Sequence, residues 1–565
     1  MDGNKDIPTS PQPVEEQPPA TPWHAELAQS AGQSPPSKDG APSQPPAPAP
    51  ETDNAAAGSA ASQPNWTVAI DLAWHFKTSP EMQSAEDRIA QLKNETAGKP
   101  VEFVVQLYRP ATGQQGGAPK IDRILIHDGQ VTDLGEQDSA GPAKDLASLL
   151  DTAATKAPSQ HIALVMTEDG IASRGFLGDS GSLSIPELNQ AVHDGLKGRN
   201  DGKLDVLDMN SCLMGDTAVL AGVQPVAAHV VGSAELESMN VDPQDPSKRH
   251  IGQDTSATLH DLLGNPNMTP GQLADTFVKH ADQEAAAAKT LGENKTPEMQ
   301  AMAGTATLAH YDLSQLSNFE ANLNQFGQTL TGAAKDLSNK LAIEEAVTES
   351  SRLGAGQPVS QHDLKSFVDK IVESIQSGKL KDPDGAIKNA ADKLLKAQDS
   401  LISSRHLDSS PDYANQGALG TFLPDQGFYK EVDERTSLNW LFQLSGQMVD
   451  KDTPAATRQQ LLEQLDSGFD RFKSFLPAES LKNLTPLTEA RQALANASDG
   501  KEFAAGLADY RNALRNLADQ RGVIEGELAE GHAELDKWLT SGSINASPSW
   551  TAFVKLLSAD APGNQ

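Results

Sequence analysis

Five short apolar segments in the first half of the chain each have the length and composition of a buried β-strand. They lie at residues 66–72, 101–108, 162–166, 204–209 and 226–231. Stretches with apolar residues three and four positions apart lie between several of them, as at 84–94 and 146–154, and this spacing is typical of amphipathic helices. Strands that alternate with helices in this way predict a mostly parallel sheet with helices on both faces.

Two local signals predict a turn and a helix start within this region. Asp128-Gly129 lies between two strand-like segments, which predicts a tight hairpin turn. Ser184, followed by Pro186 and Glu187, predicts the start of a helix, because serine caps the first turn and a glutamate three residues later completes the cap.

Beyond about residue 254 the pattern becomes mostly helical. Apolar residues with helical spacing recur at 269–281, 313–337, 363–378, 384–402, 438–449, 461–475 and 502–539, and earlier at 213–220. Strand-like segments are few here, chiefly 305–309 and 419–423. We therefore expect an α/β domain at 65–250, a mostly helical extension of it at 251–475 and a C-terminal helical region at 476–565.

Residues 1–64 are rich in Pro, Ala, Ser and Gln, as in APSQPPAPAP at 41–50. Such a segment buries too little apolar surface to offset its ordering entropy, so we expect a disordered tail. It would serve as a spacer, or as a leader or partner-binding segment.

The net charge of −32 and the pI near 4.7 argue against nucleic acid as a partner, because phosphate binding needs clustered Lys and Arg. Basic peptides or basic proteins would be attracted instead. The single cysteine excludes an internal disulfide.

The sequence also bears on where the chain resides. It has no run of the ~18 apolar residues that a membrane span needs, and residues 1–22 lack the blocks of a secretory signal. We expect a protein that is cytoplasmic or is exported without a Sec signal peptide.

Several blocks of the α/β region follow one another in a recognisable order. They are 66–72 (WTVAIDL), 104–107 (VVQL), 162–170 (IALVMTEDG), 182–188 (SLSIPEL) and 204–215 (LDVLDMNSCLMG). In order and spacing they resemble the clostripain-type cysteine peptidases, and weaker similarity extends the resemblance over about 66–450. Asn210-Ser211-Cys212-Leu213-Met214 looks like the family's Asp-Ala-Cys-Leu-Met nucleophile motif.

The resemblance implies a caspase-like α/β fold, a Cys–His dyad and cleavage after Arg or Lys. Cys212 is then at the nucleophile position. The block at 231–235 (VGSAE) is similar to a stretch that helps to form the family's substrate pocket, which implies a pocket role for Ser233 and Glu235.

Two positions depart from the family pattern. The family has His-Gly after the third strand, where this chain has Thr167-Glu168-Asp169-Gly170, so Asp169 occupies the position of the histidine and Glu168 precedes it. The acidic pocket residue two positions before the nucleophile is Asn210 here. Asp208 is near and, by strand alternation, points the same way as Asn210, but one residue separates them.

Asp169 is a poor replacement for a histidine base. A thiol attacks a carbonyl as the thiolate, and an unassisted cysteine with a pKa of ~8.5 is mostly protonated near neutral pH. An aspartate with a pKa of ~4 is already ionised, and its charge raises the pKa of a nearby thiol. Among the other histidines, His250 and His260 are the candidates for a relocated base, because they follow the fifth strand and could fold back over the sheet edge.

No metal or cofactor motif is present in the sequence, which has neither His-Glu-x-x-His nor cysteine pairs nor an EF-hand pattern. A calcium ion at Asp179-Ser180-Gly181 is the weak alternative, since related peptidases often use calcium.

These observations leave three functional interpretations. The first is a pseudoenzyme of the clostripain type, a hydrolase fold with an impaired site that binds a peptide or protein. The second is an active cysteine endopeptidase that uses Cys212 with a relocated base and altered specificity. The third is an exported effector or scaffold that uses the fold as a platform. The oligomeric state stays open.

Overall fold

The computed structural model describes part of the chain. The described residues are 64–72, 79–109, 119–167, 169–170, 172, 175–178, 181–199, 202–237, 239–241, 249–251, 255–290, 307–354, 361–408, 413–423, 441, 444–445, 449–475, 484–520 and 547–558. The chain divides into two units, Met1–Ser62 and Gln63–Gln565. The tail predicted at 1–64 therefore lies outside the described residues, apart from Pro64.

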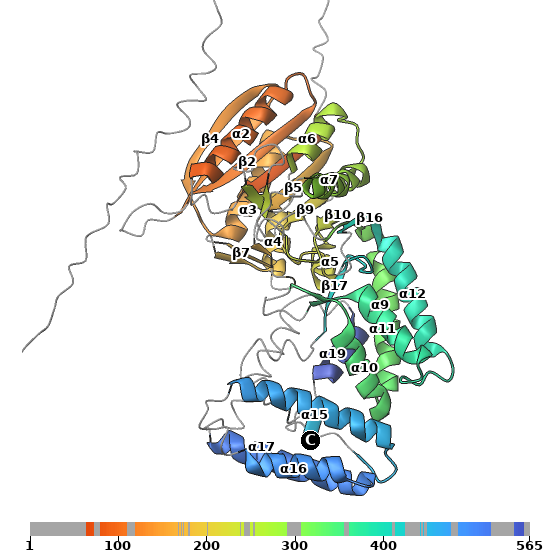
Figure 1. The fold of residues 1–565 in the computed structure, drawn as a ribbon. Coiled ribbons are helices and arrows are strands. Elements are labelled where there is room, and N and C mark those ends of the chain that lie inside the picture. The colour runs from red at the N-terminus through yellow and green to blue at the C-terminus, as the bar shows by residue number, and fades with distance from the viewer. Residues whose placement is uncertain are drawn as a thin grey trace, which may run out of the picture. The chain divides into compact units, whose positions relative to one another are not determined.

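A nine-stranded sheet is the centre of the second unit, in the order β16-β13-β10-β9-β5-β1-β2-β3-β4 (Figure 1). Its strands are β1 (Trp66–Leu72), β2 (Val101–Arg109), β3 (Lys120–His127), β4 (Gln130–Asp138), β5 (His161–Thr167), β9 (Leu204–Asn210), β10 (Ala227–Gly232), β13 (Thr307–Asp312) and β16 (Ile402–Leu407). The five central strands β10, β9, β5, β1 and β2 are parallel, and antiparallel strands flank them on both sides.

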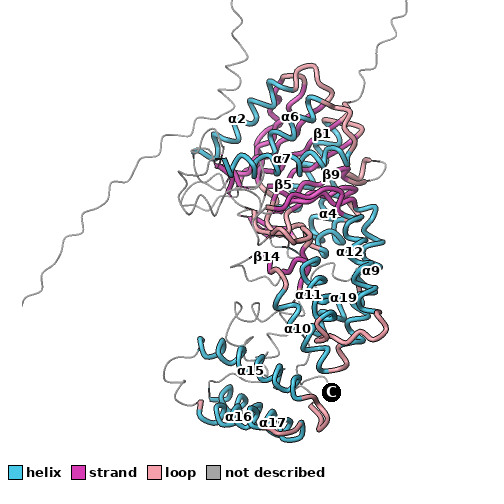
Figure 2. Tube along the Cα trace, turned by 45° about the vertical axis from the view of Figure 1, so that its right-hand side comes forward, coloured by secondary structure: helices cyan, strands magenta, loops and turns pink. Residues whose placement is uncertain are grey.

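Helices cover both faces of this sheet, as predicted. Helices α3 (Pro142–Lys156), α4 (Ile185–Gly195) and α5 (Thr217–Val223) share an apolar core with strand residues such as Leu164, Leu207 and Met209. Helices α2 (Ser79–Glu95), α6 (Thr255–Gly264) and α7 (Pro270–Thr290) lie on the other face (Figure 2). Asp208, between Leu207 and Met209, therefore points toward the face of α7.

The predicted turn and cap are both confirmed. Asp128 and Gly129 join β3 to β4 with φ angles of 46° and 72°, the positive values that a two-residue hairpin turn needs. Ser184 caps α4 in a complete capping box, in which Ser184 and Glu187 each accept a backbone N–H of the other residue.

Two predicted helices have different bounds. The helix expected at 213–220 begins only at Thr217, because Leu213 takes a left-handed φ of 61° and the Asp216 side chain caps α5. The segment expected at 313–337 breaks into α9 (Leu316–Ala333) and α10 (Leu337–Glu349), since the Asp336 side chain accepts the first backbone N–H groups of α10.

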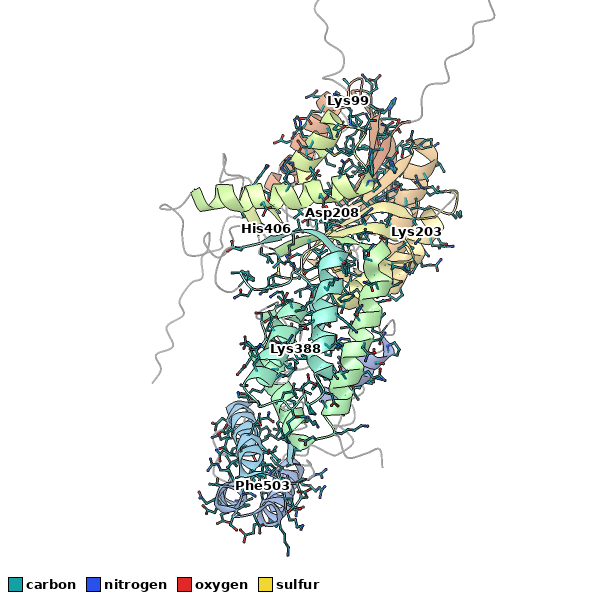
Figure 3. The ribbon with its side chains drawn as sticks, turned by 90° about the vertical axis from the view of Figure 1, so that its right-hand side faces the viewer. Lys99, Lys203, Asp208, Lys388, His406 and Phe503 are labelled. Carbon is teal, nitrogen blue, oxygen red and sulfur yellow. The ribbon has the colours of Figure 1, made fainter. Side chains whose placement is uncertain are left out.

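The rest of the chain adds helices to the same core. Helices α9, α11 (Leu364–Gln376), α12 (Ala386–Leu401) and α19 (Pro548–Ser558) contribute to the core shared with α3 to α5. A small sheet follows the order β14 (Arg352–Leu353), β15 (Gln361–Asp363) and β17 (Gly420–Phe422). Helices α15 (Ala455–Phe475), α16 (Thr485–Asn496) and α17 (Gly500–Gln520) form a separate apolar cluster that includes Phe503 (Figure 3). Among the described helices, none is long and apolar enough to cross a membrane.

Candidate active site

Cys212 lies in the turn that follows β9, at the carboxyl edge of the parallel strands. The last residue of β9, Asn210, pairs with Thr167 at the end of β5. The loops that leave these two strands therefore start side by side, where chemistry collects in open parallel sheets. This is the arrangement that the sequence predicts for a catalytic pair.

The residue after the predicted histidine position contacts this turn directly. A Cβ atom added to Gly170 would lie 2.2 Å from the carbonyl oxygen of Cys212 and 2.9 Å from the Met214 side chain. Only glycine fits such a close approach. Asp169 precedes Gly170 in strand β6 (Asp169–Gly170), where its backbone pairs with Leu177. The side chain of Asp169 and the whole of Glu168 lie outside the described part of the chain.

Backbone hydrogen bonds hold the cysteine turn against the segment that follows β10. The Leu213 amide donates to the carbonyl oxygen of Glu235 at 3.0 Å, and the Gly215 amide donates to that of Ser233 at 2.6 Å. This geometry requires a left-handed φ at Leu213, a conformation that non-glycine residues rarely adopt. Strain of this kind is found where the surrounding structure over-determines a turn.

The Cys212 sulfur lies between an apolar cluster and a backbone amide. Cys212 is partly exposed and packs, with Leu236, against a small cluster of buried side chains, Ala172, Leu213, Ala234 and Leu353. The Glu237 amide nitrogen donates to Sγ at 3.2 Å, and the Glu237 carbonyl oxygen is 3.9 Å from Sγ. An N–H that points at sulfur stabilises a thiolate more than a thiol.

The residue whose amide contacts the Cys212 sulfur carries a buried carboxyl group. The Glu237 side chain is 8% exposed, and neither of its carboxyl oxygens has a hydrogen-bond partner among the described residues. Burial, together with the charges of Asp208 and of Glu284 on α7, raises the pKa of Glu237 well above its usual value. Asp208 is fully buried on β9 (Figure 3). Potential negative charge is therefore concentrated at the Glu237 carboxyl group, in the residue whose backbone amide contacts the Cys212 sulfur.

The other predicted pocket residues are all buried near the turn. Asn210 is at the end of β9, on the same face as Asp208. The Ser233 hydroxyl lies 3.1 Å from the Thr307 hydroxyl and 3.0 Å from the Glu235 carbonyl oxygen. The Glu235 carboxylate accepts the backbone N–H groups of Leu236 and Gly354. Through these hydrogen bonds, Ser233 and Glu235 hold the segment after β10 that contacts the cysteine turn.

The histidines with described side chains have partners other than Cys212. His260 contacts Glu95 at the end of α2, near the amino ends of the strands and away from the cysteine turn. Seven further rings pair with carboxylates or hydroxyls: His127 with Glu102, His161 with Asp205, His193 with Asp194, His280 with Asp261, His310 with Asp275, His362 with Ser350 and His406 with Asp282. The His229 ring pairs with that of His310.

His250 remains a candidate base by position. Its backbone lies in β12 (Arg249–Ile251), which pairs with β11 (Met239–Val241) directly after Glu237, and its side chain is outside the described part. His75 follows β1 by three residues and is likewise outside it. The sequence prediction did not consider His75, although its place after a strand was the available signal.

Glu237 and Glu284 were also missed. Glu237 lies two residues beyond the block quoted for the pocket, and its closeness in sequence to that block was the available signal. Strand alternation does not apply to it, because β10 ends at Gly232. Glu284 comes from α7, which is distant in sequence, and no local pattern indicates that Glu284 lies near Glu237. Among the described residues, no three His, Cys, Asp or Glu side chains are placed to hold a metal ion. Asp179 and Ser180, of the suggested calcium loop, lie outside the described residues.

Comparison with known proteins gives the following matches. The sequence model of the clostripain family matches residues 119–403, a little over half of the chain. A secreted C11 cysteine protease of Bacteroides thetaiotaomicron is 14% identical over 64% of this chain and 93% of its own, with a TM-score of 0.43. An inactive zymogen C11 protease of Parabacteroides distasonis is 14% identical over 65% and 94%, with a TM-score of 0.41. No curated protein matches the chain.

Proposed function

Because the chain belongs to the clostripain family of cysteine peptidases, we propose that it uses the family's substrate site to bind a basic peptide or protein segment without cutting it. The observation that carries this proposal is the buried carboxyl group of Glu237, which has no hydrogen-bond partner among the described residues and belongs to the residue whose backbone amide contacts the Cys212 sulfur. A buried carboxylate is costly unless a cation or hydrogen-bond donors compensate it. A Lys or Arg side chain of a ligand would supply both.

Charge complementarity supports a basic ligand. Asp208 and Glu284 add to the negative potential at Glu237, since their charges raise the pKa of its carboxyl group. A guanidinium group would reverse that effect and could donate two parallel hydrogen bonds to the carboxylate. Loss of the family's acid at Asn210 is thereby compensated by acids elsewhere in the same neighbourhood.

The position of Asp169 supports binding without cleavage. Gly170 contacts the cysteine turn, so the residue before it is adjacent to the position from which the family's histidine acts. A carboxylate there would neither stabilise the thiolate nor protonate the leaving amine at neutral pH.

Peptide binding to a charge-neutral variant tests the ligand class. A fluorescent peptide with a central Arg is titrated with the wild-type protein and with Glu237→Gln, and fluorescence anisotropy gives Kd. We expect Glu237→Gln to weaken binding about ten- to a hundredfold, the effect of losing one charged hydrogen-bonded partner of about 1.5–3 kcal/mol. The matched control is Glu102→Gln, a buried glutamate at the amino end of β2, which should leave Kd unchanged. Equal affinity of wild type and Glu237→Gln would refute this site for the basic residue.

The rival function is an active cysteine endopeptidase with a relocated base. It is favoured by the Glu237 amide that donates to Sγ, since such a donor stabilises a thiolate. The wild-type protein is incubated with an electrophilic Arg peptide and with a peptide library, beside Cys212→Ala. Turnover that needs Cys212 would replace the binding proposal with the rival. His75→Ala and His250→Ala would then identify the base, because only the variant that removes it would abolish turnover.

Restoring the imidazole tests the position assigned to Asp169. In Asp169→His, Cys212 should react faster with iodoacetamide near neutral pH, because an imidazolium lowers the pKa of a neighbouring thiol. Asp133→His, on the exposed strand β4, is the control for a new surface histidine. An unchanged rate in Asp169→His would mean that another residue occupies the histidine position.

A further inference from the structure

Helix α19 docks into the main core although it is the last described element of the chain. Trp550, Phe553 and Val554 are almost fully buried there, and Leu557 is buried at the edge. The Trp550 ring stacks on Phe326 of α9 at 6.3 Å and meets Phe367 of α11 edge-on at 6.2 Å. This helix lies beyond residues 119–403, so it is an addition to the part that matches the family.

Helix α9 provides a fitted socket for α19. A Cβ atom added to Gly327 would lie 2.9 Å from Trp550 Cα and 3.0 Å from the Ser549 carbonyl oxygen, so glycine permits the two helix backbones to approach. The Asn324 side chain accepts the Ser549 backbone N–H at 2.9 Å and thereby satisfies one of the free donors at the start of α19. The cavity that remains between α19, α5 and β17 is about 20 Å³, room for about one water molecule.

Hydrogen bonds connect this socket to the cysteine turn through β17. The Trp550 Nε1–H donates to the Thr421 hydroxyl at 3.2 Å, and the Thr217 hydroxyl donates to the same oxygen at 3.3 Å. Thr217 is the first residue of α5. One residue earlier in β17, the Gly420 amide donates to the Gly215 carbonyl oxygen at 2.7 Å, three residues after Cys212. Strand β17 thus contacts both α19 and the turn.

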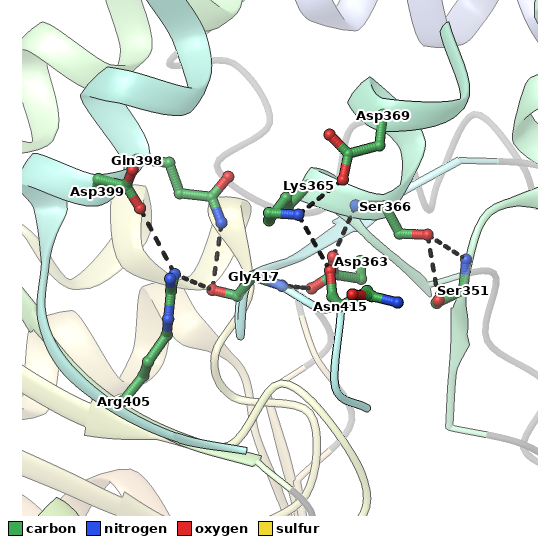
Figure 4. Close-up of polar contacts among 10 residues, drawn as sticks. All are labelled: Ser351, Asp363, Lys365, Ser366, Asp369, Gln398, Asp399, Arg405, Asn415 and Gly417. Atoms are coloured by element: carbon green, nitrogen blue, oxygen red, sulfur yellow. Dashed lines mark hydrogen bonds and ion pairs between the residues drawn. The ribbon is translucent and has the colours of Figure 1, made fainter. Parts of the chain in front are cut away.

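The segment before β17 is anchored independently of α19. The Gly417 amide donates to the Asp363 carboxylate at 2.8 Å, and its carbonyl oxygen accepts from Gln398 at 3.2 Å (Figure 4). Lys365 Nζ donates to the Asn415 carbonyl oxygen at 3.3 Å. These contacts and the pairing of β17 with β15 hold one edge of the strand, whereas α19 contacts β17 through the Thr421 side chain.

We propose that α19 acts as a strap that positions the Cys212 turn, with Thr421 as the positioning residue between Trp550 and Thr217. When α19 leaves its socket, β17 loses its outer support and the turn from Cys212 to Thr217 loosens. Release of α19 from its socket would thus change the accessibility of the Cys212 sulfur. The strap does not depend on whether the site binds or cuts.

A matched pair of glycine variants in the full-length chain tests the strap. Gly327→Ala pushes α19 away without altering α19, β17 or the turn. Gly332→Ala is on the same helix, where an added Cβ meets nothing within 4 Å. Amide hydrogen exchange is measured for α19, for residues 213–220 and for β2, beside the rate of Cys212 alkylation by iodoacetamide.

In Gly327→Ala, exchange should become faster in α19 and in 213–220 but not in β2, and alkylation should accelerate several-fold. Gly332→Ala should match the wild type. Faster exchange in α19 with an unchanged turn would overturn the coupling, and unchanged exchange in α19 would overturn the socket.

If Gly327→Ala fails to fold, substitutions of Thr421 provide a second test, because they leave the apolar contacts of α19 unchanged. Thr421→Val keeps the shape but removes the shared hydroxyl, whereas Thr421→Ser retains it. The strap requires faster alkylation of Cys212 in Thr421→Val and a wild-type rate in Thr421→Ser. Equal rates in Thr421→Val and wild type would exclude Thr421 as the positioning residue, and with it the proposed relay.

Discussion

Asp216 is buried between the cysteine turn and helix α5, where its side chain caps the helix. The same burial disfavours ionisation of its carboxyl group. One carboxyl oxygen accepts the amides of Ala218 and Val219, and the other has no hydrogen-bond partner among the described residues. Burial outweighs these hydrogen bonds and raises the pKa of Asp216 to about 7. Burial likewise raises the pKa of Asp363, which caps α11, to about 6.

Replacing Asp216 by asparagine should change how stability depends on pH. The native pKa near 7 exceeds the ordinary value of 3.8, so the native state holds more protons between these values than the unfolded state does. The free energy of unfolding should therefore fall as pH rises from ~4 to ~7 and then level off. Asparagine caps helices comparably and does not ionise. In Asp216→Asn the fall should be smaller, with a gain over wild type of up to about 4 kcal/mol above pH 7.

Urea unfolding across this pH range measures the effect. Asp336→Asn is the matched control, because Asp336 caps α10 at the surface and hydrogen bonds to Ser338 lower the pKa of its carboxyl. That cap contributes stability above the ordinary aspartate pKa, so its replacement should give no gain at neutral pH. Parallel pH profiles for Asp216→Asn and wild type would contradict the assigned cost of the buried carboxylate.

At the scale of secondary-structure elements, the sequence predicted the strands better than the helix ends. A central strand such as β5 is buried on both faces, so residues 162–166 are all apolar and the run itself shows where the strand lies. The start of α5 depends instead on the left-handed φ of Leu213 and on the cap by Asp216. Helical spacing continues through Leu213, so the pattern alone could not reveal that the helix begins at Thr217.

The packing of α3 on α4 gives a prediction at this scale. A Cβ atom added to Gly195 of α4 would lie 2.6 Å from the Ala147 carbonyl oxygen and 2.6 Å from Leu150 Cβ, so the two helices touch through this glycine. Gly195→Ala should lower the free energy of unfolding by about 1–3 kcal/mol, the usual cost of overpacking. Gly264→Ala, in α6 with nothing within 4 Å of the added carbon, should be neutral or stabilising by up to about 1 kcal/mol. Equal stability of the two variants in urea would disprove close α3–α4 contact.

At the scale of the whole molecule, the site contains groups from segments far apart in sequence. Cys212 and the residues before it were predicted because one strand and its turn carry the motif. Glu284 reaches the same neighbourhood from α7, and Leu353 comes from β14 to pack beside Leu213. These contacts arise from the order of strands and the path of the later helices, which no local pattern in the sequence specifies. For the same reason, no local pattern indicates that α19 contacts β17.

The net charge of −32 and the buried Glu237 should affect different steps in the binding of a basic ligand. Long-range attraction steers a cationic peptide toward the protein and raises its association rate, but salt screens it over a Debye length of about 10 Å at 0.1 M and about 3 Å at 1 M. Glu237 is buried, so its contact with a bound Arg is screened much less and acts mainly on dissociation.

Stopped-flow kinetics with the Arg peptide should show association slowing about tenfold between roughly 0.05 and 0.5 M salt, with little change in dissociation. Glu237→Gln should accelerate dissociation at both salt concentrations and leave the salt dependence of association intact. If the variant instead changed association alone, Glu237 would belong to the general surface field and the basic residue would be bound elsewhere.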